Sequence, residues 1–299
     1  MRRWARVAGA TGGGIVVGAA AAVAVGTGLW QRAAERAAAR LASGRVEPVA
    51  AVPAGEMRAL PEPVARYFAR VLTPGQPPIR AARVEQEGEF RAGGADAAWS
   101  PFTAVQHFAA SPPGFVWNAR IRMAPLLSVR VRDGYVGGTG EMRARLAGLL
   151  PVVDRSGGPG LNAGALHRWL AEAVWLPTAL LPGRGVAWEA VDDSTARATL
   201  ADGGTRVSLD FTFSPEGEIV RAYTPARARD VDGTDVPTPW ACRYRDYAWV
   251  DGVRIPMAGE VEWILPEGPL PYWRGRIVRV DYEREVRPAP AAAGATAIR

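Results

Sequence analysis

The sequence contains one cysteine, two histidines and no lysine among its 299 residues. The single cysteine, Cys242, excludes an internal disulfide framework and any multi-cysteine metal cluster. Two histidines, His107 and His167, leave few ligands for a zinc site. The sequence also lacks the Gly-x-Ser-x-Gly motif of many hydrolases and a glycine-rich phosphate loop placed after a strand. We therefore expect no catalytic residues, no cofactor and no bound metal.

The chain has little net charge outside its first segment. The whole sequence carries a formal charge of +6, with a pI near 10.0. Residues 1–41 hold six arginines and one acid, so the remaining 258 residues carry 30 basic and 29 acidic groups. A nucleic-acid-binding protein concentrates positive charge on one surface. The nearly neutral body therefore indicates that nucleic acid is not a partner.

An uncharged run of 24 residues extends from Val7 to Trp30, with arginines on both sides. As a helix this run would span roughly 36 Å, enough to cross a bilayer core. A cleaved signal peptide is the alternative, with Ala22-Val23-Ala24 as its exit site, but its apolar stretch is usually shorter. The length favours a single-pass anchor in the cell membrane. The short basic start favours an N-terminus inside the cytoplasm and a body outside it.

The composition divides the chain into four segments. Residues 1–43 are predicted to be the membrane anchor and its helical extension, and residues 44–55 a linker. Residues 56–288 hold the alternating strands of a β-rich globular domain. The alanine- and proline-rich end, residues 289–299, has the composition of a disordered tail.

The body reads as about ten or eleven strands bounded by glycine, proline or aspartate. Hairpin turns are expected at Asp133-Gly134, Asp202-Gly203 and Asp251-Gly252. One helical segment, residues 161–182, interrupts the strands, and Pro177 should kink or end it. Strands do not alternate with helices. The fold class is therefore mainly β (α+β): a large curved antiparallel sheet or incomplete barrel with a helix packed in or against it, plus the N-terminal transmembrane helix.

The segment YRDYAWVDGVRIPMAGEVEW, residues 244–263, carries large apolar groups on both faces of its predicted hairpin. Tyr244 and Val250 fall on one parity, whereas Tyr247 and Trp249 fall on the other. A sheet that covers a single core is usually polar on its second face. Either a second element, a partner or a lipid surface covers that face, or a bulge shifts the parity. The sequence leaves both explanations open.

From about Leu60 to Tyr282 the chain resembles an uncharacterised bacterial family that is common in actinobacteria. The resemblance covers most of the body and has no known activity attached to it. It is carried by the stretches LPEPVARYF, WSPFTAVQHF, PPGFVWNARIRM, LAEAVWLPTALLP, VDDSTARATLADGG and LPYWRGRI.

The late strands are also similar to those of the LolA-like outer-membrane lipoprotein carriers. The similarity lies in VSLDFTFSPEGEIV and in the later hairpin, where Gly252 to Pro256 form a G-x-x-I-P strand after an acidic-glycine turn. This resemblance implies an incomplete antiparallel barrel whose hollow receives acyl chains. The membrane segment departs from those soluble carriers and argues against long-range shuttling.

Eleven tryptophans are the main compositional peculiarity of the chain. Core packing explains most tryptophans, and a subset could line a ligand hollow. We expect a membrane-anchored, extracytoplasmic, non-enzymatic domain that binds an apolar or lipid-like ligand. A structural or protein-interaction module with a filled core is one alternative, and an enzyme of unidentified type is another. The candidate lining residues of the hollow are Trp117, Trp169, Glu172, Trp175, Trp249 and Trp263.

Overall fold

The structure is a computed structural model that describes residues 2–44, 57, 59–125 and 127–285. The expected tail, and the expected linker apart from its first residue, lie outside these residues. The fold is mainly β, as predicted.

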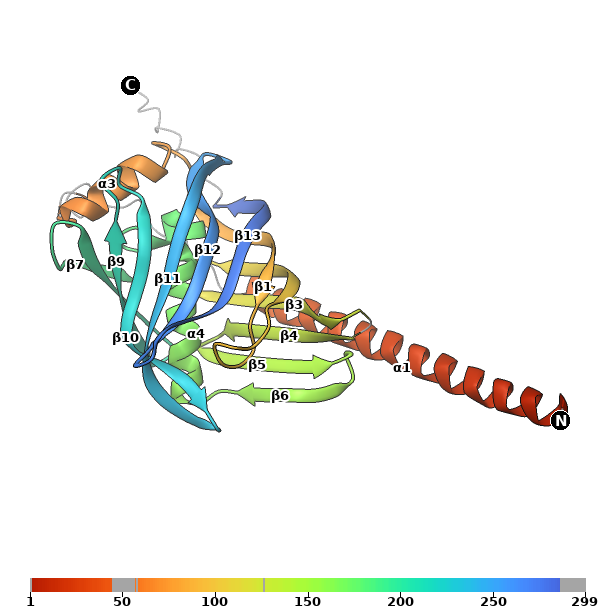
Figure 1. Cartoon of the computed structure of the whole chain (residues 1–299). Helices are drawn as coiled ribbons and strands as arrows, with labels where there is room; N and C mark the ends of the chain where they lie inside the picture. The colour runs from red at the N-terminus through yellow and green to blue at the C-terminus, as the bar shows by residue number, and fades with distance from the viewer. Residues whose placement is uncertain (1, 45–56, 58, 126, 286–299) are drawn as a thin grey trace, which may run out of the picture.

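Thirteen antiparallel strands form one sheet that curls into an incomplete barrel, two or three strands more than the sequence indicated (Figure 1). The order across the sheet is β6-β5-β4-β3-β2-β1-β13-β12-β11-β10-β9-β8-β7. Alternating sequences account for strands such as β2 and β9, in which residues at every second position are buried. The strands are β1 (Ile79–Phe90), β2 (Ser100–Ala109), β3 (Gly114–Ala124), β4 (Leu127–Val136), β5 (Thr139–Leu146), β6 (Leu150–Ser156), β7 (Val186–Ala190), β8 (Thr195–Asp202), β9 (Thr205–Phe213), β10 (Ile219–Val231), β11 (Thr234–Val250), β12 (Val253–Leu265) and β13 (Gly268–Arg284).

The tight turns follow backbone requirements, and two of the three predicted turns were misplaced. Asp202 ends β8, and the turn that follows is Gly203-Gly204, with φ of 54° and 77°. β11 and β12 meet at Asp251-Gly252, as predicted, with φ of 44° and 78°. Asp133-Gly134, however, lies inside β4. The turn that follows β4 is Gly137-Gly138, with φ of 58° and 78°. Two positive φ angles favour glycine at both central positions, so the second dipeptide forms the turn and Asp133 stays in the strand.

Helix α4 (Pro159–Glu172) lies against the concave face of the sheet (Figure 1). Two short 3₁₀ helices follow it, η1 (Ala173–Trp175) and η2 (Pro177–Leu180). The proline ends the preceding turn as predicted, because it has no backbone N–H to donate. Leu166, Leu170 and Leu180 are fully buried, so this segment forms one wall of the main core.

Helix α3 (Glu62–Val71) covers one end of the curled sheet (Figure 1). Its apolar residues recur at helical spacing, and Val64, Tyr67, Phe68 and Val71 are all buried. The ring of Tyr67 packs edge-on against Phe213 of β9, with centroids 5.9 Å apart. The core is thus closed at this end.

Helix α1 (Arg2–Ala42) packs the C-terminal part of its length on the convex face of β2, β3 and β4. Trp30, Ala34, Ala37 and Leu41 are buried on one side of the helix. The indole Nε1 of Trp30 donates a hydrogen bond to Asn118 Oδ1 at 2.8 Å. The expected helical extension is therefore helical and belongs to the body. Among the described residues, no helix is both long enough and apolar enough to cross a membrane.

Asp246, between Tyr244 and Tyr247 of the β11–β12 hairpin, has a left-handed backbone conformation with a φ of 60°, while the pairing with β12 stays in register on both sides of it. Tyr244 and Tyr247, three positions apart, both reach into the protein. Their hydroxyls donate to the carbonyls of Ala171, at 2.9 Å, and Ile219, at 2.7 Å. No register shift in the pairing with β12 accounts for this pair of tyrosines.

Candidate functional site

A hollow of ≈ 630 Å³ remains between α4 and the concave face of the sheet. Its walls come from strands on both sides of the β1–β13 pairing, and aromatic rings make up much of them. Exposed residues of the loop after β1 contribute to the lining, so the hollow reaches the surface. The aromatic and aliphatic lining residues are Phe90, Trp117, Ile121, Val131, Met142, Trp175, Trp240, Tyr244, Val261, Trp263, Leu270, Tyr272 and Trp273.

The structure brings four of the six predicted lining residues together. Trp117, Glu172, Trp175 and Trp263 all line the hollow. The other two are not among its lining residues. Trp169 is buried, and its indole donates to the Ala109 carbonyl at 3.0 Å, whereas Trp249 is 54% exposed near the end of β11. That any of them binds a ligand stays a prediction.

One wall of the hollow contains an ion cluster in which two carboxylates surround the guanidinium of Arg168. Its guanidinium lies 2.5 Å from an Asp133 oxygen and 2.9 Å from Glu172 Oε1. The side-chain amide of Gln106 donates to the other Glu172 oxygen at 2.7 Å. Burial raises the pKa of Glu172, while the Arg168 charge opposes that rise. The cluster therefore fixes α4 to β2 and β4 through charged hydrogen bonds.

A second arginine of the hollow, Arg227, has aromatic and carbonyl neighbours. Its Cζ lies 4.7 Å from the ring centroid of Trp240 and 5.3 Å from that of Trp263. Its Nε and Nη2 donate to the Gly164 carbonyl of α4 at 3.2 and 3.0 Å. Trp263 stacks on Tyr272 with centroids 5.9 Å apart. This corner combines a cation with a flat apolar surface.

Sequence reasoning missed the three charged residues Asp133, Arg168 and Arg227. Asp133 was interpreted as a turn residue because glycine follows it. Arg168 and Glu172 stand four positions apart around Trp169, a spacing that predicts an ion pair on one helix face. That spacing is the signal that could have revealed part of the cluster. Arg227 has no comparable signal, since its partners come from α4, β11 and β12.

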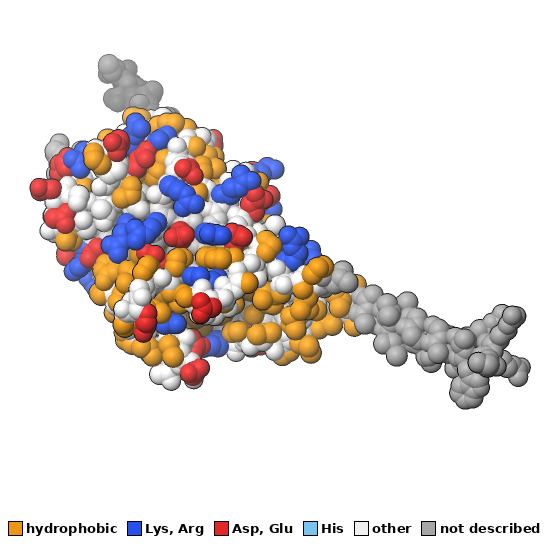
Figure 2. Space-filling view, in the orientation of Figure 1, with side chains coloured by type: hydrophobic (Ala, Val, Ile, Leu, Met, Phe, Trp, Pro, Cys, Tyr) orange, Lys and Arg blue, Asp and Glu red, His pale blue; other side chains and the backbone are white. Residues whose placement is uncertain are grey.

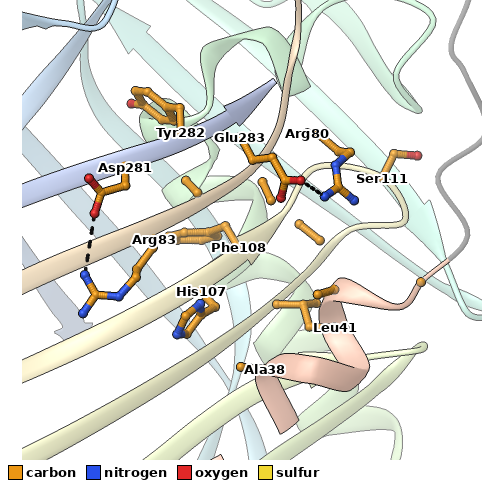
Figure 3. Close-up of a pocket in the computed structure, with 15 residues that line it drawn as sticks. Ala38, Leu41, Arg80, Arg83, His107, Phe108, Ser111, Asp281, Tyr282 and Glu283 are labelled. Atoms are coloured by element: carbon orange, nitrogen blue, oxygen red, sulfur yellow. Dashed lines mark hydrogen bonds and ion pairs between the residues drawn. The ribbon is translucent and has the colours of Figure 1, made fainter. Parts of the chain in front are cut away.

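A smaller pocket of ≈ 240 Å³ lies on the outer face, between the end of α1 and strands β1, β2 and β13 (Figure 3). Ion pairs border it: Arg80 with Glu283, and Arg83 with Asp281 at 3.7 Å. His107 also lines it, and burial together with the Arg83 charge lowers the pKa of this imidazole. Its lining is part polar and part apolar, and these ion pairs already balance the charges of Arg80 and Arg83.

The two histidines and the buried carboxylate do not form one site. An enzyme would be favoured by a cleft joining Glu172 with His107, Arg120 or Arg122. Glu172 instead lines the inner hollow, while His107 lines the outer pocket beside α1. Arg120 and Arg122 are exposed. The structure therefore does not bring these groups together.

His167 on α4 is expected to make the protein less stable in acid. Burial, reinforced by the Arg227 charge, lowers the pKa of this imidazole to about 4. The unfolded chain, with a His pKa near 6.5, then binds more protons than the folded chain between these values. Stability should fall as pH decreases from about 6.5 to 4, by up to about 3 kcal/mol.

His167→Leu should remove this part of the pH dependence. The measurement is urea unfolding of wild type and variant at several pH values, with the difference between the two curves assigned to the imidazole. If the free energies of unfolding of wild type and variant change in parallel from pH 7 to pH 4, the prediction is wrong.

The comparisons with known proteins give a family and two distant structural likenesses. A family model described as "Family of unknown function (DUF6920)" matches residues 58–282. No curated protein matches the chain.

The chain is similar in structure to a putative outer membrane lipoprotein-sorting protein domain from Vibrio parahaemolyticus, with 8% identity and a TM-score of 0.37, over 77% of this chain and 95% of that one. It is also similar to a LolA superfamily protein from Nitrosomonas europaea, with 10% identity and a TM-score of 0.33, over 78% and 96% of the two chains. The family match spans most of the chain and confirms the resemblance found between Leu60 and Tyr282. The chain therefore belongs to the DUF6920 family of unknown function.

Proposed function

We propose that this chain is a non-enzymatic domain, anchored in the cell membrane with its body outside the cytoplasm, that binds a lipid-like ligand in its hollow. The observation that carries the proposal is the aromatic-lined space of ≈ 630 Å³ beside α4. Ligand sites are typically ~300–1,000 Å³ and mostly apolar, with a few polar groups that fix orientation. The hollow has this size and this composition.

A filled-core structural module is a weaker candidate. Such a module would have its sheet packed solid by the segment that follows α4. In the structure, Trp175 of η1 borders open volume, and so do Val131, Val261 and Trp273 on the sheet. An apolar ligand would remove these surfaces from water, at ~25 cal/mol per Å². That gain favours occupation of the hollow.

Native mass spectrometry of the full chain tests the ligand proposal. The chain is released from detergent in the spectrometer, so bound species are weighed with it. We expect a population carrying lipid-like mass, and uptake of a dansyl-labelled C11 fatty acid by any ligand-free fraction. Protein that is consistently ligand-free and takes up no probe would exclude the proposal.

The membrane part of the proposal is supported by the uncharged run Val7–Trp30 and by apolar residues beside α1. Gly26 of α1 packs against the β5–β6 turn, where an added Cβ would clash with a Leu149 methyl. Leu150 and Val152 next to this turn are 64% and 61% exposed. Hydrophobic side chains gather where α1 leaves the body (Figure 2). An apolar patch of this kind fits a lipid surface.

A fluorophore at position 150 is expected to enter the lipid interface. An NBD group attached to Leu150→Cys should emit at shorter wavelength and higher intensity in the protein reconstituted into vesicles. The comparison is the same group on a short peptide in water without detergent. The matched control is Val191→Cys: Val191 is 48% exposed and follows β7, the edge strand at the other end of the sheet from β6. Equal emission from both positions in vesicles would show that this patch does not contact lipid.

A further inference from the structure

Five arginines and four acids line the hollow, and two of these arginines, Arg168 and Arg227, differ in whether an acid pairs with them. Arg168 lies within ion-pair distance of Asp133 and Glu172. Arg227 forms no ion pair with any acid in the described part of the chain, and its two hydrogen bonds both go to the Gly164 carbonyl. A carbonyl satisfies donors but leaves the positive charge in place.

Two acids of the β10–β11 hairpin close to Arg227 in sequence are engaged elsewhere, and a third, Asp232 at the turn, is exposed. Asp230 and Asp235, on the β10–β11 hairpin, both pair with Arg155 of β6. Arg229, two positions along β10, also lines the hollow, and its Cζ lies 5.8 Å from the Trp263 ring centroid. Two guanidinium groups thus face the same aromatic corner, with no carboxylate of the described chain paired to either.

Arg227 also lies close enough to two neighbouring groups to affect their pKa values. The Arg227 charge contributes to the lowered pKa of His167 and opposes the burial-driven rise in the pKa of Cys242. A half-buried cation beside apolar rings attracts an anion, because the low local dielectric strengthens the attraction.

We propose that the ligand of the hollow is an amphiphile with one anionic headgroup, a carboxylate or a phosphate monoester. This inference rests on the proposed function. The headgroup oxygens accept hydrogen bonds from Arg227, whose Nη1 makes no hydrogen bond to the described residues, and from Arg229. The guanidinium fork suits such oxygens. The alkyl chain lies along the rings of Trp263, Tyr272 and Trp175.

Competition binding on the full chain tests the headgroup. Dansyl-labelled C11 fatty acid is displaced by hexadecanoate, hexadecyl phosphate or hexadecanol, which share one alkyl chain and differ in the headgroup. We expect the anions to bind about 10- to 100-fold more tightly than the alcohol, as for hydrogen bonds to charged groups. The two anions, compared with each other, show whether carboxylate or phosphate is preferred.

Arg227→Gln should reduce anion affinity by about the same factor and leave hexadecanol affinity unchanged. Arg229→Gln should give a smaller loss of the same kind, which protects the test if the first variant folds poorly. The matched control is Arg221→Gln: Arg221 lies on the same strand and contacts the ring of Tyr223 at 4.5 Å, but does not line the hollow.

The outcomes separate the two proposals. Equal affinity of wild type for the alcohol and the anions, or unchanged anion preference in both variants, would overturn the headgroup assignment and leave the lipid-binding proposal standing. Binding of none of the three amphiphiles would overturn both.

Discussion

Replacing Arg168 with methionine is expected to lower the free energy of unfolding by about 3–5 kcal/mol, because it leaves the carboxylates of Asp133 and Glu172 without their cation in a poorly hydrated wall. Glu172 already has a raised pKa with Arg168 present. Without the guanidinium it should take up a proton, and the residual loss should shrink at low pH. Urea unfolding monitored by circular dichroism at pH 5 and pH 8 measures both effects.

The control is an exposed ion pair with the same helical spacing. Arg66 and Glu62 on α3 are also four residues apart and 2.7 Å from each other, with side chains 42% and 65% exposed. Arg66→Met should cost only about 0.3–0.5 kcal/mol, since water solvates the remaining carboxylate. If the Arg168 variant loses no more than the Arg66 variant, the buried cluster does not hold α4 in place.

Filling the hollow is expected to abolish most ligand binding while sparing the fold. Val261 on β12 lines the hollow and pairs with Cys242 and Trp273 of the neighbouring strands. Val261→Trp places an indole in the open space, so affinity for the dansyl fatty acid should fall by up to about 100-fold, as in overpacked sites that lose 1–3 kcal/mol. Stability should change little, because the indole meets space and not packed atoms.

Val278→Trp is the matched control for this substitution. Val278 on β13 is 55% exposed, so the same change adds bulk without entering the hollow, and affinity should stay at the wild-type value. Fluorescence titration measures affinity, and urea unfolding measures stability. Wild-type affinity in the Val261 variant would place the ligand elsewhere.

Much of the architecture could be predicted from local patterns. Alternation at every second residue identified the strands of a curved antiparallel sheet, and the spacing of Leu166, Trp169 and Leu170 identified the helix against it. The helical segment breaks before Pro177, where η2 begins, and Asp251-Gly252 forms its turn, because each requirement is met within a few residues. These signals act over short separations and therefore appear in one sequence.

The charged half of the site could not be predicted in the same way. Asp133-Gly134 has the composition of a turn, but Gly137-Gly138 satisfies two positive φ angles better, so Asp133 remains in β4 and reaches Arg168. The partners of Arg227 come from three separate elements. Only the folded arrangement shows that acids pair with Arg168 and that none of the described acids pairs with Arg227.

The position of α1 also required the structure. Trp30 and Asn118 are 88 residues apart, and their hydrogen bond fixes the helix on the convex face. Trp249 had the same composition signal as the lining tryptophans, yet it is exposed near the end of β11. Tryptophan content predicts large apolar contacts without specifying the face on which they form.

The strand order has a consequence for how the chain folds. Every pairing in the sheet joins strands that follow one another along the chain, except the one between β1 and β13. Two meanders, β1 to β6 and β7 to β13, can each form by quick local steps, whereas the β1–β13 pairing closes a loop of nearly 200 residues, as between Phe90 and Trp273. Closing long loops slows folding. We expect that seam to form last and to separate first under mechanical load, with the two meanders outlasting it.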